Sequence, residues 1–149
     1  MQKQLVEIAV KGLMPAQNGV AVFLGPEKKT FVIHVDPAIG KAMHKAIQGT
    51  RNDRPLTHDL IARIFVGFGI AVERVVINRH EEDAFFAMLV MRMANEVERK
   101  IVEIDARPSD CIVLALQAKC PIFVTRAVLD EVEDVTELLD RIRDHGDAE

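Results

Sequence analysis

The first 35 residues contain three apolar runs separated by turn-forming residues, and this pattern constrains the fold of the chain most strongly. The runs cover residues 5–14, 20–24 and 31–35. Proline and glycine lie in both segments between them, so the runs predict a three-stranded antiparallel meander. A chain that opens with consecutive paired strands is expected in a class with runs of strands, and not in the strictly alternating α/β class.

Apolar residues at helical spacing predict helices in the rest of the chain, separated by further strands. The expected helices cover residues 38–47, 56–68, 108–119 and 132–142. The expected strands cover residues 72–77, 84–93, 97–104 and 122–124. The predicted fold is therefore α+β, a single compact domain with a mixed or antiparallel sheet, three main helices and an acidic C-terminal helix.

At 149 residues, with 49% apolar and 28% charged residues, the chain has the size and balance of one globular domain. We expect that domain to cover residues 1–132, followed by an acidic helix and tail over residues 133–149. No apolar run approaches the roughly 20 residues of a membrane span, so no membrane partner is expected. The first residues lack the apolar segment of an export signal, which favours a cytoplasmic protein.

The formal net charge of −4 is unevenly distributed along the chain. Residues 130–149 contain nine acidic and two basic side chains, which leaves a formal charge of +3 on residues 1–129. A weakly basic body is compatible with a phosphate-containing ligand, although it does not require one. Tryptophan and tyrosine are absent, so the chain has few aromatic side chains on which nucleic-acid bases could stack.

Two predicted helices open with an Arg-Pro pair followed by polar residues. The first opening has the sequence RPLTHD at residues 54–59, and the second has RPSD at residues 107–110. Proline is expected at the first helical position in both, because its missing N–H costs nothing there. Each opening therefore combines an arginine with the free backbone N–H groups of a helix N-terminus.

The polar residues of these openings have two interpretations. In the first they are helix caps: Thr57 and Asp110 accept backbone N–H groups, and Asp59 complements the helix dipole. The two arginines then form ion pairs with the neighbouring Asp53 and Asp105. In the second interpretation the openings form an anion site. A cation at a helix N-terminus opposes the dipole, whereas an arginine beside free N–H groups suits a phosphate.

In the second interpretation the two openings meet in one cleft and divide the chemistry between them. The groups expected to bind phosphate are Arg54, Thr57, Arg107 and Ser109. The groups expected to supply acid–base chemistry or metal ligands are His58, Asp59, Asp105 and Asp110. A divalent metal such as Mg²⁺ or Mn²⁺ is a candidate cofactor, although no ligand spacing demands one. Cys111 and Cys120 match no metal spacing and are expected in the core.

At these openings the sequence resembles the bifunctional nuclease domain family. The residues that carry the resemblance are RPLTHDL at 54–60, IDARPSD at 104–110 and PIFV at 121–124, and the likeness extends over residues 5–132. The resemblance implies a compact α+β domain that self-associates, with the DNase and RNase activity credited to plant members. This chain departs from the family at Ile39-Gly40, where members usually have a Glu-Ala pair.

These features support two main hypotheses of function. The first is a nuclease acting on DNA or RNA phosphodiesters, with nucleic acid as its partner. The second is a non-catalytic oligomeric module that binds a small anionic or nucleotide ligand, which the acidic net charge and Ile39-Gly40 favour. A scaffold with a vestigial site is a third alternative. A homo-oligomer is expected because residues 84–93 are apolar on both faces, although a buried central strand explains this pattern equally.

Overall fold

The computed structural model describes residues 4–147, which form seven strands and five helices. The strands are β1 (Leu5–Ala16), β2 (Gly19–Gly25), β3 (Phe31–Val35), β4 (Ile70–Glu81), β5 (Ala84–Ala94), β6 (Arg99–Ala106) and β7 (Ile122–Thr125). The helices are α1 (Pro37–Gln48), α2 (Thr57–Gly67), α3 (Pro108–Ala118), α4 (Arg126–Glu131) and α5 (Thr136–Asp147). The predicted α+β class is confirmed. Each of these helices is too short or too polar to cross a lipid bilayer.

The seven strands form one mixed sheet in the order β3-β2-β1-β7-β4-β5-β6. The predicted N-terminal meander is confirmed, because β1 pairs antiparallel with β2, and β2 pairs antiparallel with β3. A second antiparallel meander contains β4, β5 and β6. The short strand β7 lies between the two meanders, antiparallel to β1 and parallel to β4. A late segment of the chain therefore joins the two halves of the sheet.

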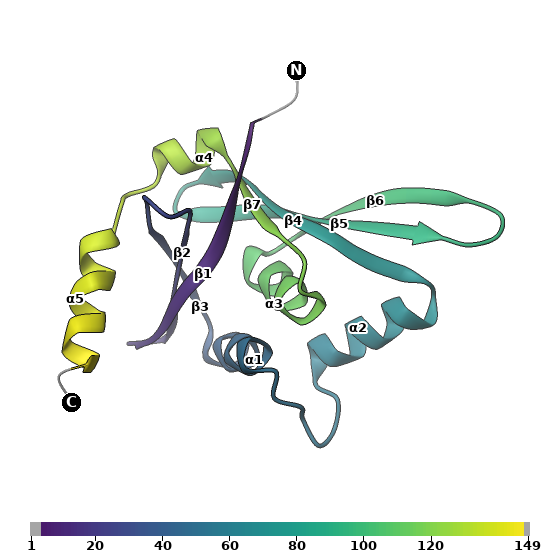
Figure 1. The fold of residues 1–149 in the computed structure, drawn as a ribbon, viewed down its shortest axis with the longest axis horizontal. Helices are drawn as coiled ribbons and strands as arrows, with labels where there is room; N and C mark the ends of the chain where they lie inside the picture. The colour runs from purple at the N-terminus through teal and green to yellow at the C-terminus, as the bar shows by residue number, and fades with distance from the viewer. Residues whose placement is uncertain (1–3, 148–149) are drawn as a thin grey trace.

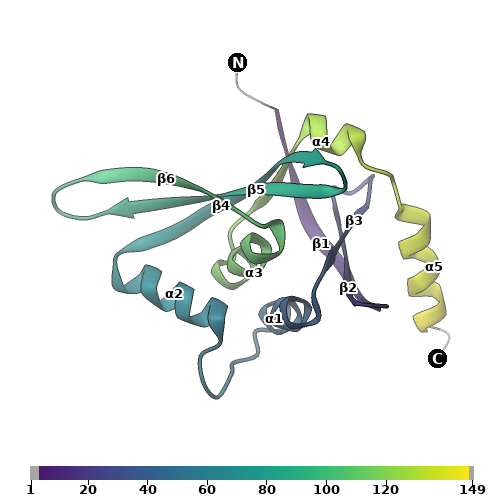
Figure 2. The same ribbon diagram turned by 180° about the vertical axis from the view of Figure 1, so that it is seen from behind.

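The main core lies between the sheet and the three helices α1, α2 and α3 (Figures 1 and 2). Helix α3 buries residues 111–115 completely or almost completely, as its apolar character on all sides predicts. Met43 of α1 and Val75 of β4 are also fully buried in this core. Burial raises the pKa of the Cys111 thiol to about 12, so this cysteine is a core residue and not a nucleophile.

The C-terminal segment contains the predicted acidic helix, but this helix starts later than expected. A short helix that the sequence analysis missed, α4, follows β7 directly, and Thr125 Oγ1 accepts the backbone N–H of Val128 at its start. Val132 ends α4 and is buried in the main core. Helix α5 begins at Thr136 and packs through Leu139 on the opposite face of the sheet (Figure 1). Apolar spacing did not reveal that Val132 and Leu139 belong to different cores.

Helix α1 approaches the sheet closely at Gly40. The helix is capped by Asp36, whose carboxylate accepts the backbone N–H of Ile39 at 2.9 Å. A Cβ atom on residue 40 would lie 2.3 Å from Val20 Cγ2 and 2.7 Å from Val20 Cβ. These separations are far below van der Waals contact, so the missing side chain sets the distance between α1 and β2.

Several apolar side chains on the outer side of α2 remain exposed. Leu60, Ile64 and Phe68 recur at four-residue spacing, and their exposed fractions are 55%, 47% and 72%. Ile101 and Ile104 are exposed on β6, which is an edge strand of the sheet. An apolar stripe of this kind is a feature of surfaces that contact another protein molecule.

Candidate functional site

The N-terminal ends of α2 and α3 are in direct contact. His58 Nε2, in the first turn of α2, lies 2.9 Å from Asp110 Oδ1 in the first turn of α3, across 52 residues of sequence. The other carboxylate oxygen, Asp110 Oδ2, accepts a hydrogen bond from Arg107 Nε at 2.9 Å. Three of the predicted site residues therefore form one network, His58–Asp110–Arg107.

This network runs from the protein interior to the solvent. The exposed fraction of the side chain is 8% for His58, 31% for Asp110 and 65% for Arg107. Burial of Asp110 opposes its ionisation, but the hydrogen bonds from Arg107 and His58 outweigh this effect, so the pKa of its carboxyl lies below the usual value. Asp110 is therefore an anion at neutral pH.

The charge on Asp110 determines the tautomer of a neutral His58. A carboxylate can only accept hydrogen bonds, so His58 Nε2 must carry the proton. Nδ1 is then the unprotonated ring nitrogen, and no side-chain hydrogen bond joins it to another residue within the described part of the chain. A histidine that a carboxylate orients in this way can accept a proton at its other nitrogen.

Asp59 organises the loop before α2 through three hydrogen bonds. Its Oδ2 accepts the backbone N–H of Leu56 at 2.9 Å and Asn52 Nδ2 at 2.8 Å, and its Oδ1 accepts Gln117 Nε2 at 3.2 Å. The Leu56 N–H, followed by the Asn52 amide, holds the pKa of Asp59 below its usual value. The structure gives this carboxylate a role in starting the helix and leaves it little capacity to accept a proton.

The same contacts explain why α2 starts later than predicted. The sequence predicts Pro55 at the first helical position, whereas α2 begins at Thr57 with Leu56 as its N-cap residue. The prediction is wrong because Asp59 bonds back to Leu56, as the third helical residue does in a capping box. At α3 the prediction is confirmed, because Pro108 is the first helical residue.

The lowered pKa of Asp59 predicts a pH-dependent contribution to stability. Because the folded carboxyl binds protons less readily than the unfolded one, its contribution is present at neutral pH and is lost as the pH falls below about 4. The difference in free energy of unfolding between the wild type and Asp59→Asn should therefore be largest at pH 7 and shrink toward pH 3. Urea titrations at several pH values measure this difference. Asp110 titrates in both proteins, so its contribution cancels in this difference. A difference that stays constant between pH 7 and pH 3 would contradict the role assigned to Asp59.

A cavity of about 530 Å³ lies between α1, the loop that follows it, α2 and the end of α3, and we call it the α1–α2–α3 cavity. His58 is among the residues that line this cavity, with 8% of its side chain exposed. The cavity is also lined by four cations from separate parts of the chain, namely Lys45, Arg51, Arg63 and Lys119. None of the four is within ion-pair distance of a carboxylate among residues 4–147.

The α1–α2–α3 cavity concentrates positive charge on an acidic protein. The whole chain has a formal charge of −4, yet four cations and a single carboxylate, that of Asp59, line this cavity. Such a local excess attracts anions such as phosphate. The sequence analysis missed these four cations because they share no motif or spacing. The excess of basic residues in the segment 1–129 was the sequence signal that pointed to them.

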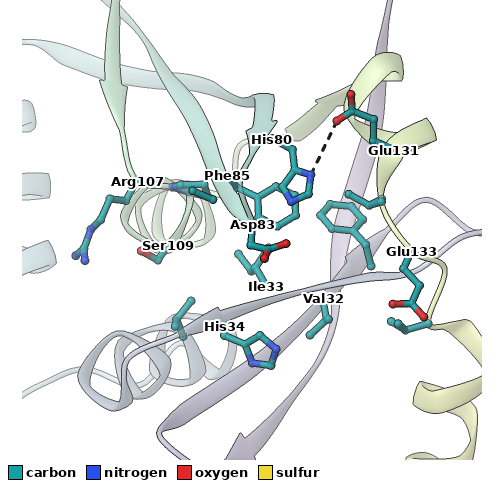
Figure 3. Close-up of a pocket in the computed structure, with 16 residues that line it drawn as sticks. Val32, Ile33, His34, His80, Asp83, Phe85, Arg107, Ser109, Glu131 and Glu133 are labelled. Atoms are coloured by element: carbon teal, nitrogen blue, oxygen red, sulfur yellow. Dashed lines mark ion pairs between the residues drawn. The ribbon is translucent and has the colours of Figure 1, made fainter.

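Two other predicted site residues, Arg107 and Ser109, line a different cavity, also of about 530 Å³ (Figure 3). Its other walls come from β3, the turn between β4 and β5, and the segment after α4. At its far end His80 faces Glu131, with 3.9 Å between His80 Nδ1 and Glu131 Oε2. The expected single cleft is therefore divided into two cavities, and Asp110 links them through its contacts with His58 and Arg107.

Three predicted site residues belong neither to the His58–Asp110–Arg107 network nor to the lining of the two cavities. Arg54 and Thr57 are exposed and line neither of the two cavities. Asp105 lies opposite Met88 in the pairing of β5 with β6, and this register points both side chains away from the face that carries α1, α2 and α3. The expected ion pair of Arg107 with Asp105 is replaced by the pair with Asp110.

The protein groups do not fit a metal site built from three side-chain ligands. Within the described residues, no three His, Cys, Asp or Glu side chains are arranged so that they could hold a metal ion. The oxygens of Asp59 and Asp110 are occupied by hydrogen bonds, and Asp105 lies on the other face of the sheet. No catalytic step is therefore assigned to a metal ion.

The segment that builds both helix openings and the α1–α2–α3 cavity identifies the class of protein. Residues 22–137 match the family model of the bifunctional nuclease domain, so the chain belongs to this family and the resemblance seen in the sequence is confirmed.

Individual relatives share about half of this chain. An uncharacterized protein of Mycobacterium tuberculosis is 39% identical over 82 residues, which are 55% of this chain and 46% of that protein. Bifunctional nuclease 1 of Oryza sativa subsp. indica is 31% identical over 84 residues, which are 56% of this chain and 25% of that protein. The chain thus spans about half the length of the mycobacterial relative and a quarter of the rice relative.

Proposed function

We propose that this chain is a nuclease that hydrolyses phosphodiester bonds of DNA or RNA, with His58 as the general base. The observation that carries the proposal is the position of His58, whose Nε2 lies 2.9 Å from Asp110 Oδ1 and which is one of the residues that line the cationic α1–α2–α3 cavity. Membership of the bifunctional nuclease domain family and similarity to a rice protein of that name support the same reaction class.

In the proposed reaction, water attacks the phosphorus atom while His58 Nδ1 takes its proton. The new oxygen–phosphorus bond forms as the ester bond to the leaving oxygen breaks. The negative charge of Asp110 stabilises the imidazolium that results, as a carboxylate does behind a histidine base. The imidazolium then returns its proton to the leaving oxygen, so that the net change is the addition of one water molecule.

The cations of the α1–α2–α3 cavity supply the electrostatic part of the mechanism. A phosphodiester gains negative charge on its oxygens as the reaction proceeds, and fixed cations stabilise that charge. Arg107 acts through Asp110 and is a positioning residue. Arg54, Thr57 and Ser109 lie outside this cavity, and we assign them to contacts with the remainder of the nucleic acid chain.

The proposal is tested with the purified chain on end-labelled single-stranded and double-stranded DNA and RNA. We expect strand cleavage that a His58→Gln protein, purified in the same way, does not show. Parallel reactions with Mg²⁺, with Mn²⁺ and with EDTA determine whether a divalent cation takes part. If all substrates remain intact under all these conditions, the proposed nuclease activity is overturned. The alternative, a module that binds a nucleotide without cleaving it, then remains.

We also propose that the chain forms a homo-oligomer through the exposed apolar stripe of α2. Burying Leu60, Ile64 and Phe68 against the same surface of a second copy removes exposed apolar area from water. Light scattering should give a mass that is a multiple of 16.7 kDa, and Ile64→Glu should reduce it to that of the monomer. A wild-type mass of 16.7 kDa at micromolar concentration would contradict self-association.

A further inference from the structure

Gln117, one of the residues that line the α1–α2–α3 cavity, carries a buried polar atom that the described part of the protein does not satisfy. Gln117 Oε1, near the end of α3, has no hydrogen-bond donor within residues 4–147. The amide nitrogen of the same side chain donates to Asp59 Oδ1 at 3.2 Å. Because the Asp59 carboxylate can only accept, this contact fixes the orientation of the amide and leaves Oε1 as a free acceptor. Buried acceptors are rarely left unpaired, so a ligand in the cavity that brings a donor would be stabilised by this oxygen once the Gln117 side chain turns toward it.

The charges around the same cavity define the other part of such a ligand. The cations Lys45, Arg51, Arg63 and Lys119 line the cavity and have no carboxylate within 4.0 Å among the described residues. The Asp59 carboxylate accepts three hydrogen bonds and, within the described residues, forms no ion pair with these cations. A suitable ligand therefore carries negative charge together with a hydrogen-bond donor.

The size and lining of the cavity limit how much of a nucleic acid it can hold. Its volume of about 530 Å³ is that of an ordinary small-molecule site. Proteins that hold several bases of a single strand use aromatic side chains as stacking platforms. Of the described residues, no phenylalanine lines this cavity, and the one aromatic ring among its lining residues, the His58 imidazole, is only 8% exposed. The cavity is therefore suited to one nucleotide unit and not to an extended strand.

We infer that the α1–α2–α3 cavity binds one nucleoside monophosphate unit, with its phosphate on the cations and an amino group of its base on Gln117 Oε1. The unit is a free mononucleotide or the phosphorylated end of a strand, which present the same chemistry to the cavity. This inference rests on the proposed function, because it assigns the substrate unit that lies beside His58. It makes the enzyme one that acts on strand ends or on short fragments.

Calorimetric titration of the wild type with four probes tests the ligand class. Adenosine 5′-monophosphate is expected to bind, whereas ribose 5-phosphate and inorganic phosphate, which lack the base, should bind about tenfold more weakly or worse. Adenosine, which lacks the phosphate, should show no binding at millimolar concentration. Equal affinity for adenosine 5′-monophosphate and ribose 5-phosphate would overturn the role of the base.

Matched variants then test the residues. Gln117→Met should raise the dissociation constant of adenosine 5′-monophosphate about tenfold while leaving that of ribose 5-phosphate unchanged. The double variant Arg63→Gln/Lys119→Gln should weaken both probes by a similar factor or more. Lys28→Gln, which removes an exposed cation far from the cavity, is the control and should change neither. Binding that is equally weakened by the control, or insensitive to the cavity variants, would overturn the site.

A measurement on the wild type avoids dependence on how well the variants fold. Acetylation of lysines, followed by mass spectrometry, should show protection of Lys45 and Lys119 by adenosine 5′-monophosphate and no protection of Lys28. A 5′-phosphorylated hexanucleotide that protects the same two lysines identifies the strand end as a source of the bound unit, and protection by the mononucleotide alone identifies the free nucleotide. Absence of protection by both would refute the inference.

These binding experiments separate the inference from the proposed function. Adenosine 5′-monophosphate contains no phosphodiester bond, so its binding is independent of hydrolysis. If adenosine 5′-monophosphate binds at the cavity but the nucleic acid substrates remain intact, the proposed nuclease activity is overturned and the nucleotide site stands. If the protein cleaves within long duplexes and the cavity variants cleave them equally well, the nucleotide site is refuted and the proposed nuclease activity stands.

Discussion

Replacing His58 by glutamine is expected to lower the kcat of phosphodiester hydrolysis by a factor of about 10²–10⁴, the usual contribution of a general base. Glutamine has a similar length and can donate a hydrogen bond to Asp110, so the contact between α2 and α3 is retained. It cannot take up the proton of the attacking water. The KM should change little, because the four cations of the cavity remain. Initial rates across a range of substrate concentrations give both constants.

Two further variants show whether the loss comes from the proposed geometry. His44→Gln makes the same change at an exposed histidine of α1 and should retain wild-type activity. Asp110→Asn removes the negative charge that fixes the His58 tautomer, so it should lower kcat while largely preserving KM. A folded His58→Gln protein with wild-type kcat would refute the assignment of His58 as the base.

Replacing Gly40 by alanine should lower the free energy of unfolding by about 1–3 kcal/mol, the usual cost of overpacking a core contact. Helix propensity alone predicts the opposite sign, because alanine is favoured over glycine in a helix by about 1 kcal/mol. The steric effect dominates because the new Cβ atom would lie 2.3 Å from Val20 Cγ2, and the branched valine cannot rotate its Cβ away. Urea unfolding measures the change.

A double-mutant cycle with Val20 identifies the cause. Adding Val20→Ala to Gly40→Ala removes the closest overlap, at 2.3 Å from Val20 Cγ2, and leaves the contact with the Cβ atom of residue 20 at 2.7 Å. The double variant should therefore be more stable than the sum of the two single effects predicts. Gly67→Ala is a suitable control because no atom beyond its own stretch of helix lies within 4 Å of the position that the new methyl group would take, and it should not destabilise the protein. If the effects of Gly40→Ala and Val20→Ala simply add, the overlap with Val20 is not the cause of the lost stability.

The parts of the fold that depend on local patterns could be predicted from the sequence. The N-terminal meander and α3 were predicted because apolar periodicity and turn residues act over a few neighbouring positions. The position of β7 between β1 and β4 could not be predicted in this way. Strand pairing of this kind joins segments far apart in the sequence, and no local pattern in residues 122–125 specifies the partners.

Some residues of the candidate site could be singled out from the sequence, but their arrangement could not. His58 and Asp110 were singled out from their helix openings, yet their contact joins positions 52 residues apart. The role of Asp59 in starting α2 was obscured by Pro55, whose usual position suggested an earlier helix start. Gln117 was missed because a single glutamine in a helix carries no sequence signal until its unpaired oxygen is seen.

The central position of β7 also has a consequence for how this domain is made. During synthesis the N-terminal meander and the β4–β6 meander leave the ribosome before the strand that pairs with both of them. Until residues 122–125 are available, β1 and β4 each expose an unpaired edge, and such edges are prone to non-native pairing. The nascent chain therefore passes through an interval of aggregation risk that ends only when β7 closes the sheet.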